Sequence, residues 1–269
     1  MPPVSAAPLA RYRRVPRWLL TDLDGTLTTR GALTAAAVAA VERVAACGVR
    51  VAVVTGRPAA WGDALARLLP LHAVVAENGA VTFARAAGGD IVRTCAVPDD
   101  RRDAVRAALF AAVEDAIARC APGARLAADQ RYREIDVAVD WNEQVHLEVA
   151  AADRLAAALR AAGFAASRSS VHVNVGPAGI DKLTAARALV GGIDPSDVLY
   201  VGDALNDAPM FGGFPHTVGV ANVADVWGQL EHRPRYVTDA AEGAGFVEVA
   251  DAIARNAAAR YASRRRNAK

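Results

Sequence analysis

The chain has 269 residues, of which 53% are hydrophobic, so it can bury the core of one large domain or two modest ones. Its 31 basic and 29 acidic residues give a net charge of +2, which gives no reason to expect nucleic acid or an anionic membrane as a partner. No apolar run reaches the roughly 18 residues of a membrane-spanning helix, so no membrane span is expected.

The three cysteines, Cys47, Cys95 and Cys120, form no C-x-x-C pair, which favours reduced thiols and a cytoplasmic location over a disulfide framework. Residues 1–16 contain Pro and Arg but no apolar signal segment, and we expect a disordered leader there. Residues 263–269 are expected to form a disordered tail.

Strands and helices are expected to alternate at the start of the chain. Apolar runs predict strands at 17–22, 49–56 and 72–80, and helices at 34–48 and 58–70 separate them. This order, with short connections, predicts a doubly wound and mainly parallel α/β sheet.

The middle of the chain has a different pattern. A hairpin around Gly88–Gly89 is expected within 81–97, and amphipathic helices are expected at 99–121 and 151–163. Residues 132–141 and 169–176 alternate polar and apolar positions, as half-exposed strands do. Together these segments predict an inserted α+β domain over about 84–176.

The alternation of strands and helices then returns, so 17–83 and 177–262 should form one Rossmann-like core. The expected helices are 181–192, a short one within 206–213, and 246–262; the expected strands are 196–203, 216–222 and 235–239.

Polar residues follow several of the core strands at their carboxyl ends, where ligands of open parallel sheets bind. Asp22 and Asp24 follow the first strand, and Thr55 follows the second. Asp203 and its neighbours follow a late strand, and Lys182 opens the helix before that strand. Each cluster alone is also compatible with a turn, a helix cap or a solvated charge.

Taken together, these residues suit phosphate chemistry. Crowded carboxylates raise each other's pKa, and a hard divalent cation such as Mg²⁺, which prefers oxygen ligands, relieves that repulsion. A lysine, a threonine hydroxyl and turn N–H groups bind phosphoryl oxygens. A carboxylate that attacks phosphorus would form an aspartyl-phosphate intermediate.

Four motifs, in this order, resemble the haloacid dehalogenase superfamily of Mg²⁺-dependent phosphotransferases: "DLDGT" (22–26), "VVTGR" (53–57), "DK" (181–182) and "GDALND" (202–207). The resemblance implies that Asp22 is the nucleophile and that Asp24 is the general acid and base. It implies Mg²⁺ bound by Asp22, the backbone carbonyl of Asp24, and Asp203. It also implies phosphate contacts and a supporting role for Asp207. The implied phosphate-binding residues are Asp22, Gly25, Thr26, Thr55, Gly56, Lys182 and Asn206, with Thr55 and Lys182 offsetting charge in the transition state.

The long stretch between Thr55 and Lys182 places the accessory cap domain between the second and third motifs. Its αββαββ order resembles the type 2, subclass B caps, and "ENGA" (77–80) is typical of the same subfamily. Relatives of this kind include sucrose-phosphate, trehalose-phosphate and mannosyl-phosphoglycerate phosphatases, Cof-like sugar phosphatases and phosphomannomutases. The resemblance therefore implies a phosphatase for a small metabolite, with a sugar phosphate as the expected substrate.

Substrate contacts are expected from the cap, because caps of this kind close over the core. Arg131, Arg133, His172 and Asn174 are the preferred candidates, since they lie on alternating segments that could share one face. Asn78 and Arg57 are further candidates near the cap–core junction. Other polar or aromatic cap residues considered are Glu134, Trp141, Asn142, Glu143 and His146.

Two other functions fit the motifs. A phosphomutase shares the first motif, but the compact "GDALND" favours hydrolysis. A catalytically idle binding or regulatory protein would require a lost catalytic residue, and every expected one is present. The chain is expected to act as a monomer or homodimer.

Overall fold

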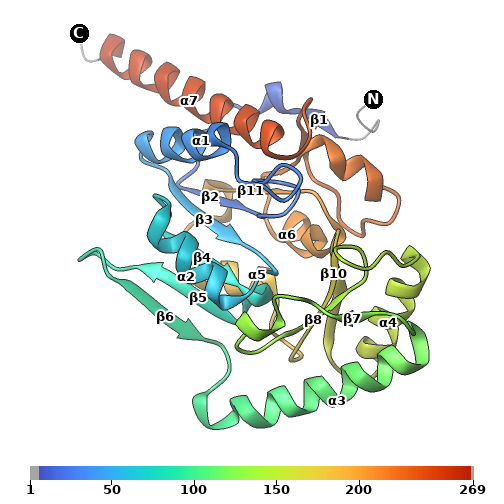
Figure 1. Cartoon of the computed structure of the whole chain (residues 1–269). Helices are drawn as coiled ribbons and strands as arrows, with labels where there is room; N and C mark the ends of the chain where they lie inside the picture. Colours follow the sequence, from blue (N-terminus) through green and yellow to red (C-terminus); the bar gives the residue numbers. More distant parts are fainter. Residues whose placement is uncertain (1–5, 268–269) are drawn as a thin grey trace. The chain divides into compact units, whose positions relative to one another are not determined.

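The computed structural model describes residues 6–267, which form two compact units (Figure 1). The first unit comprises the described part of Met1–Val53, Arg67–His72 and the described part of Val190–Lys269. The second comprises Val54–Ala66 and Ala73–Leu189. Within the described residues, no helix has the length and apolar character needed to cross a membrane.

The first unit is built on a parallel sheet. Its strands lie in the order β1 (Ala7–Pro8), β13 (Tyr236–Val237), β12 (Thr217–Gly219), β11 (Val198–Gly202), β2 (Trp18–Thr21) and β3 (Arg50–Val54). Every neighbouring pair in this order is parallel, which confirms the predicted α/β class. The four residues of β2 and the five of β11 are all buried, as expected for strands covered on both faces.

The helices of this unit are α1 (Ala35–Ala46), α6 (Ala208–Gly213) and α7 (Glu242–Asn267), and α1 and α7 pack against each other. Thr34 is the N-cap of α1, because its Oγ1 accepts a hydrogen bond from the Ala37 N–H at 3.2 Å. Short 3₁₀ helices lie at Leu9–Arg11 (η1), Pro195–Asp197 (η5), Leu205–Asp207 (η6) and Ala221–Val226 (η7).

The second unit contains two antiparallel arrangements. Strands β4 (Ala73–Ala76), β5 (Val81–Arg85) and β6 (Ile91–Cys95) form one, and the order β7–β8–β10–β9 forms the other. The latter strands are β7 (Arg125–Leu126), β8 (Val137–Asp140), β9 (Ala165–Arg168) and β10 (His172–Gly176). The remaining elements are α2 (Ala59–Leu68), which ends in the first unit, α3 (Arg102–Cys120), α4 (Val149–Ala161), α5 (Lys182–Val190), η2 (Glu77–Gly79), η3 (Asp99–Arg101) and η4 (Gln130–Tyr132).

The predicted αββαββ order is confirmed, because α3, β7, β8, α4, β9 and β10 follow one another along the chain. Val139 of β8 lies opposite Val173 of β10, and both pack with Leu109 of α3 and Leu155 of α4 in one hydrophobic core. The alternate positions of β10, which include His172 and Asn174, therefore lie on the other face of this sheet.

Several expected boundaries are corrected. The predicted leader is wrong for its described part, because β1 and η1 form there and Leu9 and Tyr12 are buried. Asn256 of α7 also donates hydrogen bonds to the carbonyls of Tyr12 and Arg14. The tail expected from residue 263 continues α7 to Asn267, since no Gly or Pro interrupts it. Residues 1–5 and 268–269 of these two predictions lie outside the described residues.

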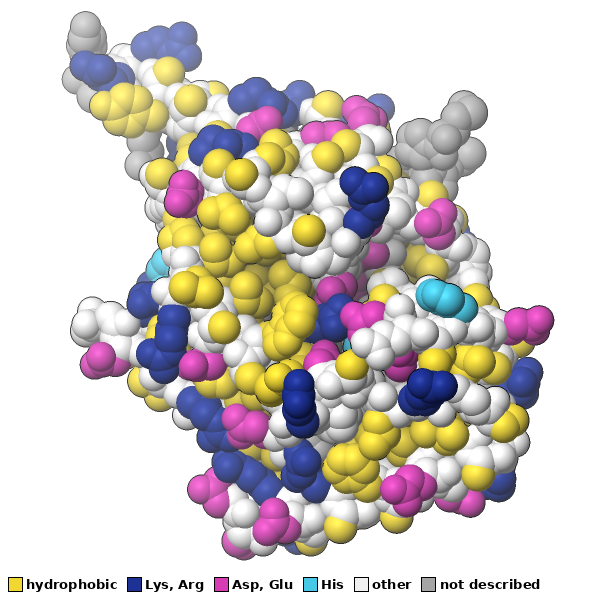
Figure 2. Space-filling model, in the orientation of Figure 1, with side chains coloured by type: hydrophobic (Ala, Val, Ile, Leu, Met, Phe, Trp, Pro, Cys, Tyr) yellow, Lys and Arg dark blue, Asp and Glu magenta, His cyan; other side chains and the backbone are white. Residues whose placement is uncertain are grey.

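The predicted cap boundary at residue 84 falls inside β5, which pairs with β4 and not with the four-stranded sheet. The predicted αββαββ order had no residue ranges for two of its strands, which the structure places at β7 and β9, and β8 is shorter than the expected 132–141. On the face shown in Figure 2, basic and acidic side chains are interspersed, in keeping with the nearly balanced composition.

Candidate active site

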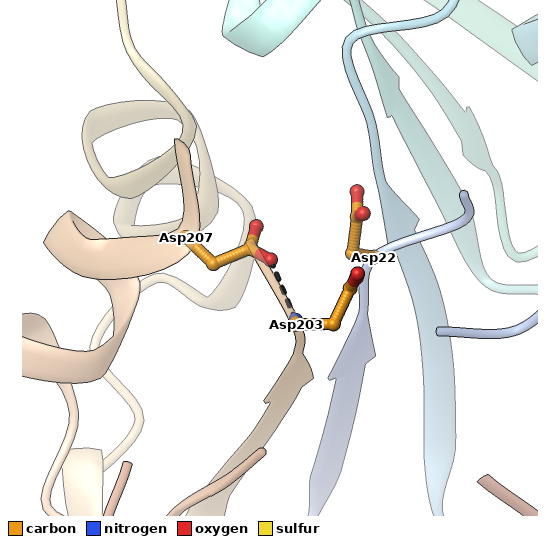
Figure 3. A group of neighbouring side chains, drawn as sticks. All are labelled: Asp22, Asp203 and Asp207. Atoms are coloured by element: carbon orange, nitrogen blue, oxygen red, sulfur yellow. Dashed lines mark hydrogen bonds between the residues drawn. The ribbon is translucent and has the colours of Figure 1, made fainter. Parts of the chain in front are cut away.

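Three carboxylates of the first unit lie together at the carboxyl ends of two neighbouring strands. Asp22 follows β2 and Asp203 follows β11, and the Asp22 N–H donates a hydrogen bond to the Val201 carbonyl at 2.9 Å. Asp207 is the last residue of η6, which follows β11 along the chain. One oxygen from each carboxylate lies within 4.8 Å of the others, and all three residues are buried (Figure 3).

Asp207 is held by donors from its own segment. Its Oδ1 accepts a hydrogen bond from the Tyr200 hydroxyl at 2.6 Å, and its Oδ2 accepts from the N–H groups of Asp203 (2.9 Å) and Ala204 (3.1 Å). The Asp203 contact is the dashed line of Figure 3. Burial, followed by the negative charge of Asp207, raises the pKa of Tyr200 well above its usual value, so the hydroxyl remains a donor.

Asp203 is fixed by residues that are remote in sequence. Thr26 donates through Oγ1 to Asp203 Oδ1 at 2.6 Å, and Asn222 donates through Nδ2 to Asp203 Oδ2 at 2.9 Å. Asn222 also donates to the Gly25 carbonyl at 3.0 Å. Gly25 has a φ of +73°, and a Cβ there would lie 2.6 Å from Asp203 Oδ2, so both conformation and space require glycine.

The donor set of this cluster fits a hard divalent cation. It offers carboxylate oxygens only, and buried carboxylates this close repel each other unless a cation or proton offsets their charge. The hydrogen bonds to Asp203 and Asp207 fix the orientation of these carboxylates before any ion binds. Asp22, Asp203 and Asp207 therefore form a candidate metal site.

Two other expected residues of the first unit lie outside this carboxylate group. The Asp24 side chain is half-buried and is not one of the three clustered carboxylates. Asn206 is buried, and its Oδ1 accepts no hydrogen bond from any residue that the structure describes.

Thr55 and Lys182 belong to the second unit, and both are buried. Thr55 follows β3, its N–H donates to the Val75 carbonyl at 2.8 Å, and its Oγ1 accepts from the Arg57 N–H at 3.0 Å. Lys182 opens α5, whose first turn is capped by the Asp181 carboxylate accepting from the Thr184 N–H at 2.7 Å.

Five ionisable side chains of the second unit form what we call the two-arginine cluster: Arg57, Asp129, Arg133, Asp136 and Glu143. Arg57 donates to Asp129 at 3.3 Å and to Glu143 at 3.0 Å. Arg133, fully buried, donates to Asp136 at 2.8 Å and to Asp129 at 3.3 Å, and it also reaches the Gly56 carbonyl at 2.8 Å. Both guanidinium groups are thus bound by carboxylates of this cluster.

Two carboxyl groups of this cluster have shifted pKa values. Burial raises the pKa of Asp136 to about 7, an effect that the positive charge of Arg133 partly offsets. The hydrogen bond that His172 donates to Glu143 at 3.0 Å, together with the charge of Arg57, lowers the pKa of Glu143 to about 2.

Two asparagine side chains lie against Gly56. A Cβ on Gly56 would lie 3.0 Å from Asn174 Nδ2 and 3.2 Å from both Asn78 Nδ2 and Asn78 Oδ1. Asn78 Nδ2 also contacts Asp136 at 3.5 Å. The Oδ1 atoms of both asparagines are buried and accept no hydrogen bond from a residue that the structure describes. These atoms are acceptors without a donor, which is uncommon for buried polar groups.

The structure therefore brings Arg57, Asn78, Arg133 and Asn174 together around Gly56, and joins His172 to them through Glu143. It does not bring in Arg131, which is exposed and lies over the ring of Tyr132 at 4.8 Å.

Sequence reasoning missed Glu77, whose carboxylate accepts four backbone hydrogen bonds. Oε1 accepts from the N–H groups of Ala59 (2.9 Å) and Glu134 (2.8 Å), and Oε2 accepts from Ile135 (2.8 Å) and Asp136 (3.0 Å). The "ENGA" motif contains Glu77, but nothing in the neighbouring sequence indicates that its carboxylate oxygens accept from backbone N–H groups so far along the chain.

Comparisons with known proteins agree with this geometry. Residues 19–113 and 137–248 match the family model of haloacid dehalogenase-like hydrolases. A phosphoglycolate phosphatase of Haloarcula marismortui is 33% identical, over 86% of this chain and 94% of its own length. A second one, of Pyrobaculum neutrophilum, is 31% identical over 87% of this chain and 94% of its length.

Solved structures show the same fold. A Thermoplasma acidophilum protein, 0175, has a TM-score of 0.69 at 21% identity and covers 89% of this chain and 99% of its own. The sucrose-phosphatase of Synechocystis has a TM-score of 0.65 at 17% identity, with coverage of 89% and 98%.

Proposed function

Because the chain belongs to the haloacid dehalogenase-like hydrolases and is a phosphatase of that family, we propose that it hydrolyses a phosphomonoester of a small metabolite, with Mg²⁺ and an aspartyl-phosphate intermediate on Asp22. The observation that carries the proposal is the buried group of Asp22, Asp203 and Asp207 at the carboxyl ends of β2 and β11. That edge of a parallel sheet is where ligands of such folds bind.

Asp22 and Asp203 would hold the metal, together with the backbone carbonyl of Asp24. Asp207 would orient the site, because its oxygens already accept hydrogen bonds from Tyr200, Asp203 and Ala204. Bound Mg²⁺ would offset the negative charge of the phosphoryl oxygens.

In the first step, an oxygen of Asp22 forms a bond to phosphorus while the bond from phosphorus to the substrate oxygen breaks. Asp24 gives its proton to the departing alkoxide. In the second step, Asp24 takes a proton from water as that water attacks phosphorus, which releases phosphate and regenerates the Asp22 carboxylate.

Thr55 and Lys182 would bind phosphoryl oxygens, aided by Gly25, Thr26, Gly56 and Asn206. A buried ammonium group and hydroxyl offset the charge that spreads over these oxygens in the transition state. These roles rest on family membership and on the matching motifs. The proposed cap, with αββαββ order, would supply substrate contacts through the residues around Gly56.

Two classes of leaving group have support. The curated relatives are phosphoglycolate phosphatases, which makes 2-phosphoglycolate the first substrate to test. A sugar phosphate, however, fits the residues around Gly56 better. Both guanidinium groups of the two-arginine cluster are already bound by its three carboxylates, so the cluster offers little attraction for a second anionic group. The free Oδ1 atoms of Asn78 and Asn174 would accept from sugar hydroxyls.

The test is Mg²⁺-dependent phosphate release from a panel of 2-phosphoglycolate, sugar phosphates, phosphoglycerate glycosides and cofactor phosphates. We expect activity that EDTA abolishes and that Asp22→Asn reduces by at least about a thousandfold, as expected when a nucleophile is lost. Retention of phosphate release by Asp22→Asn would show that the assigned nucleophile is wrong. A bisphosphate-dependent sugar isomerisation assay separates the phosphatase from a phosphomutase.

A further inference from the structure

A polar pocket lies in the first unit at the amino ends of β2 and β3, where Trp18 and Arg50 begin these strands. Asp22 follows the opposite end of β2, so the pocket is separate from the carboxylate group described above. Its volume is about 270 Å³, and Arg17, Trp18, Cys47, Gly48, Arg50 and Arg260 line it.

The charges of this pocket are all positive. Arg17, Arg50 and Arg260 contribute three guanidinium groups, and none of the residues that line it is acidic. Within residues 6–267, none of these guanidinium groups forms an ion pair with a described carboxylate. Asp197, whose carbonyl accepts a hydrogen bond from the Arg17 N–H at 2.7 Å, pairs through its carboxylate with Arg14 at 3.4 Å instead.

The aromatic residue of the pocket packs against one of these arginines. Trp18 is 5% exposed, and the guanidinium carbon of Arg50 lies 5.5 Å from the centre of its ring. This cation–π contact keeps the Arg50 charge at the pocket.

We propose that this pocket binds the phosphoryl group of a small ligand, either inorganic phosphate or a phosphorylated metabolite. Guanidinium groups match phosphate oxygens through paired N–H donors, and they attract a dianion more strongly than a neutral ligand. This second anion site is independent of the phosphatase reaction, because none of its residues belongs to the catalytic motifs.

Calorimetric titration of the full chain with inorganic phosphate, in EDTA to suppress metal-dependent binding, tests the proposal. The test variant is Arg17→Gln/Arg50→Gln/Arg260→Gln, and the matched control is Arg255→Gln, which removes an exposed charge from α7 outside the pocket. Lys182→Ala removes the proposed catalytic phosphate ligand. We expect wild type, Arg255→Gln and Lys182→Ala to bind phosphate at this site with similar affinity. The triple variant should bind phosphate at least about tenfold more weakly.

Phosphate binding by the triple variant as tight as that of wild type would overturn the proposal, as would complete loss of binding in Lys182→Ala. The triple variant should keep its turnover of p-nitrophenyl phosphate, which shows that it is folded; the single variant Arg260→Gln, on the helix surface, serves if the triple variant unfolds. Titration with glycerol 3-phosphate distinguishes a phosphorylated metabolite from free phosphate as the tighter ligand. Succinate binding as tight as phosphate binding would overturn the assignment to a phosphoryl group.

Discussion

At the scale of single residues, Asp207 shows how a buried carboxylate can support a metal site by accepting hydrogen bonds. We expect Asp207→Asn to lower the free energy of unfolding by about 2–3 kcal/mol. The new amide N–H₂ would face either the Tyr200 hydroxyl or the Asp203 N–H, which now donate hydrogen bonds to the carboxylate. The apparent affinity for Mg²⁺ should fall by about 10- to 100-fold. Urea unfolding and Mg²⁺ titration of phosphatase activity measure the two effects. Tyr200→Phe is the control, since it removes one donor and leaves the charge; equal Mg²⁺ affinity in Asp207→Asn and wild type would contradict the role.

Glu143 provides a prediction about pH. Its folded pKa of about 2 lies below the ordinary value of 4.5, so its interactions with His172 and Arg57 stabilise the fold above that ordinary value. This stabilisation is lost as the pH falls from about 4.5 toward 2. Because the side chain is 31% exposed, we expect only about 1–2 kcal/mol. The difference in unfolding free energy between wild type and Glu143→Gln should therefore shrink over this interval, and a constant difference would contradict it.

At the scale of elements, Glu77 joins the start of α2 to the segment that leads into β8. Glu77→Gln replaces an acceptor oxygen with a donor group, and two backbone N–H groups then lose their acceptor. We expect a loss of about 3 kcal/mol in the free energy of unfolding by urea. Glu134→Gln is a matched control in the same segment, because it only removes a partly exposed pair with Arg93, which should cost less than about 1 kcal/mol. Similar losses in the two variants would argue against the role of Glu77.

At the scale of the whole molecule, Mg²⁺ should stabilise the folded chain, because the folded state positions Asp22 and Asp203 and the unfolded chain does not. At a concentration about 100-fold above its Kd, bound Mg²⁺ would add about 2.7 kcal/mol. Differential scanning calorimetry with and without Mg²⁺ should show a rise in Tm that Asp203→Asn abolishes. An equal rise in that variant would place the ion elsewhere.

Strand pattern and chain order predicted much of this molecule from sequence. Apolar runs followed by Asp22 and Asp203 predicted that parallel strands would bring these carboxylates to one edge, and the structure confirms it. Asn222 could not be predicted, because its contacts with Gly25 and Asp203 depend on how distant segments pack. The ordered residues 7–12 were missed for a similar reason, since their strand forms only by pairing with β13.

The four hydrogen bonds to Glu77 have a consequence for hydrogen exchange. The amides of Glu134, Ile135 and Asp136 lie in an irregular segment, where exchange with solvent deuterium is ordinarily fast. Here a single carboxylate replaces the neighbouring strand that would otherwise accept their hydrogen bonds. These amides should therefore exchange as slowly as those of β8. In Glu77→Gln their exchange should become faster before that of β8 does, so a single side chain sets the free energy for opening this loop.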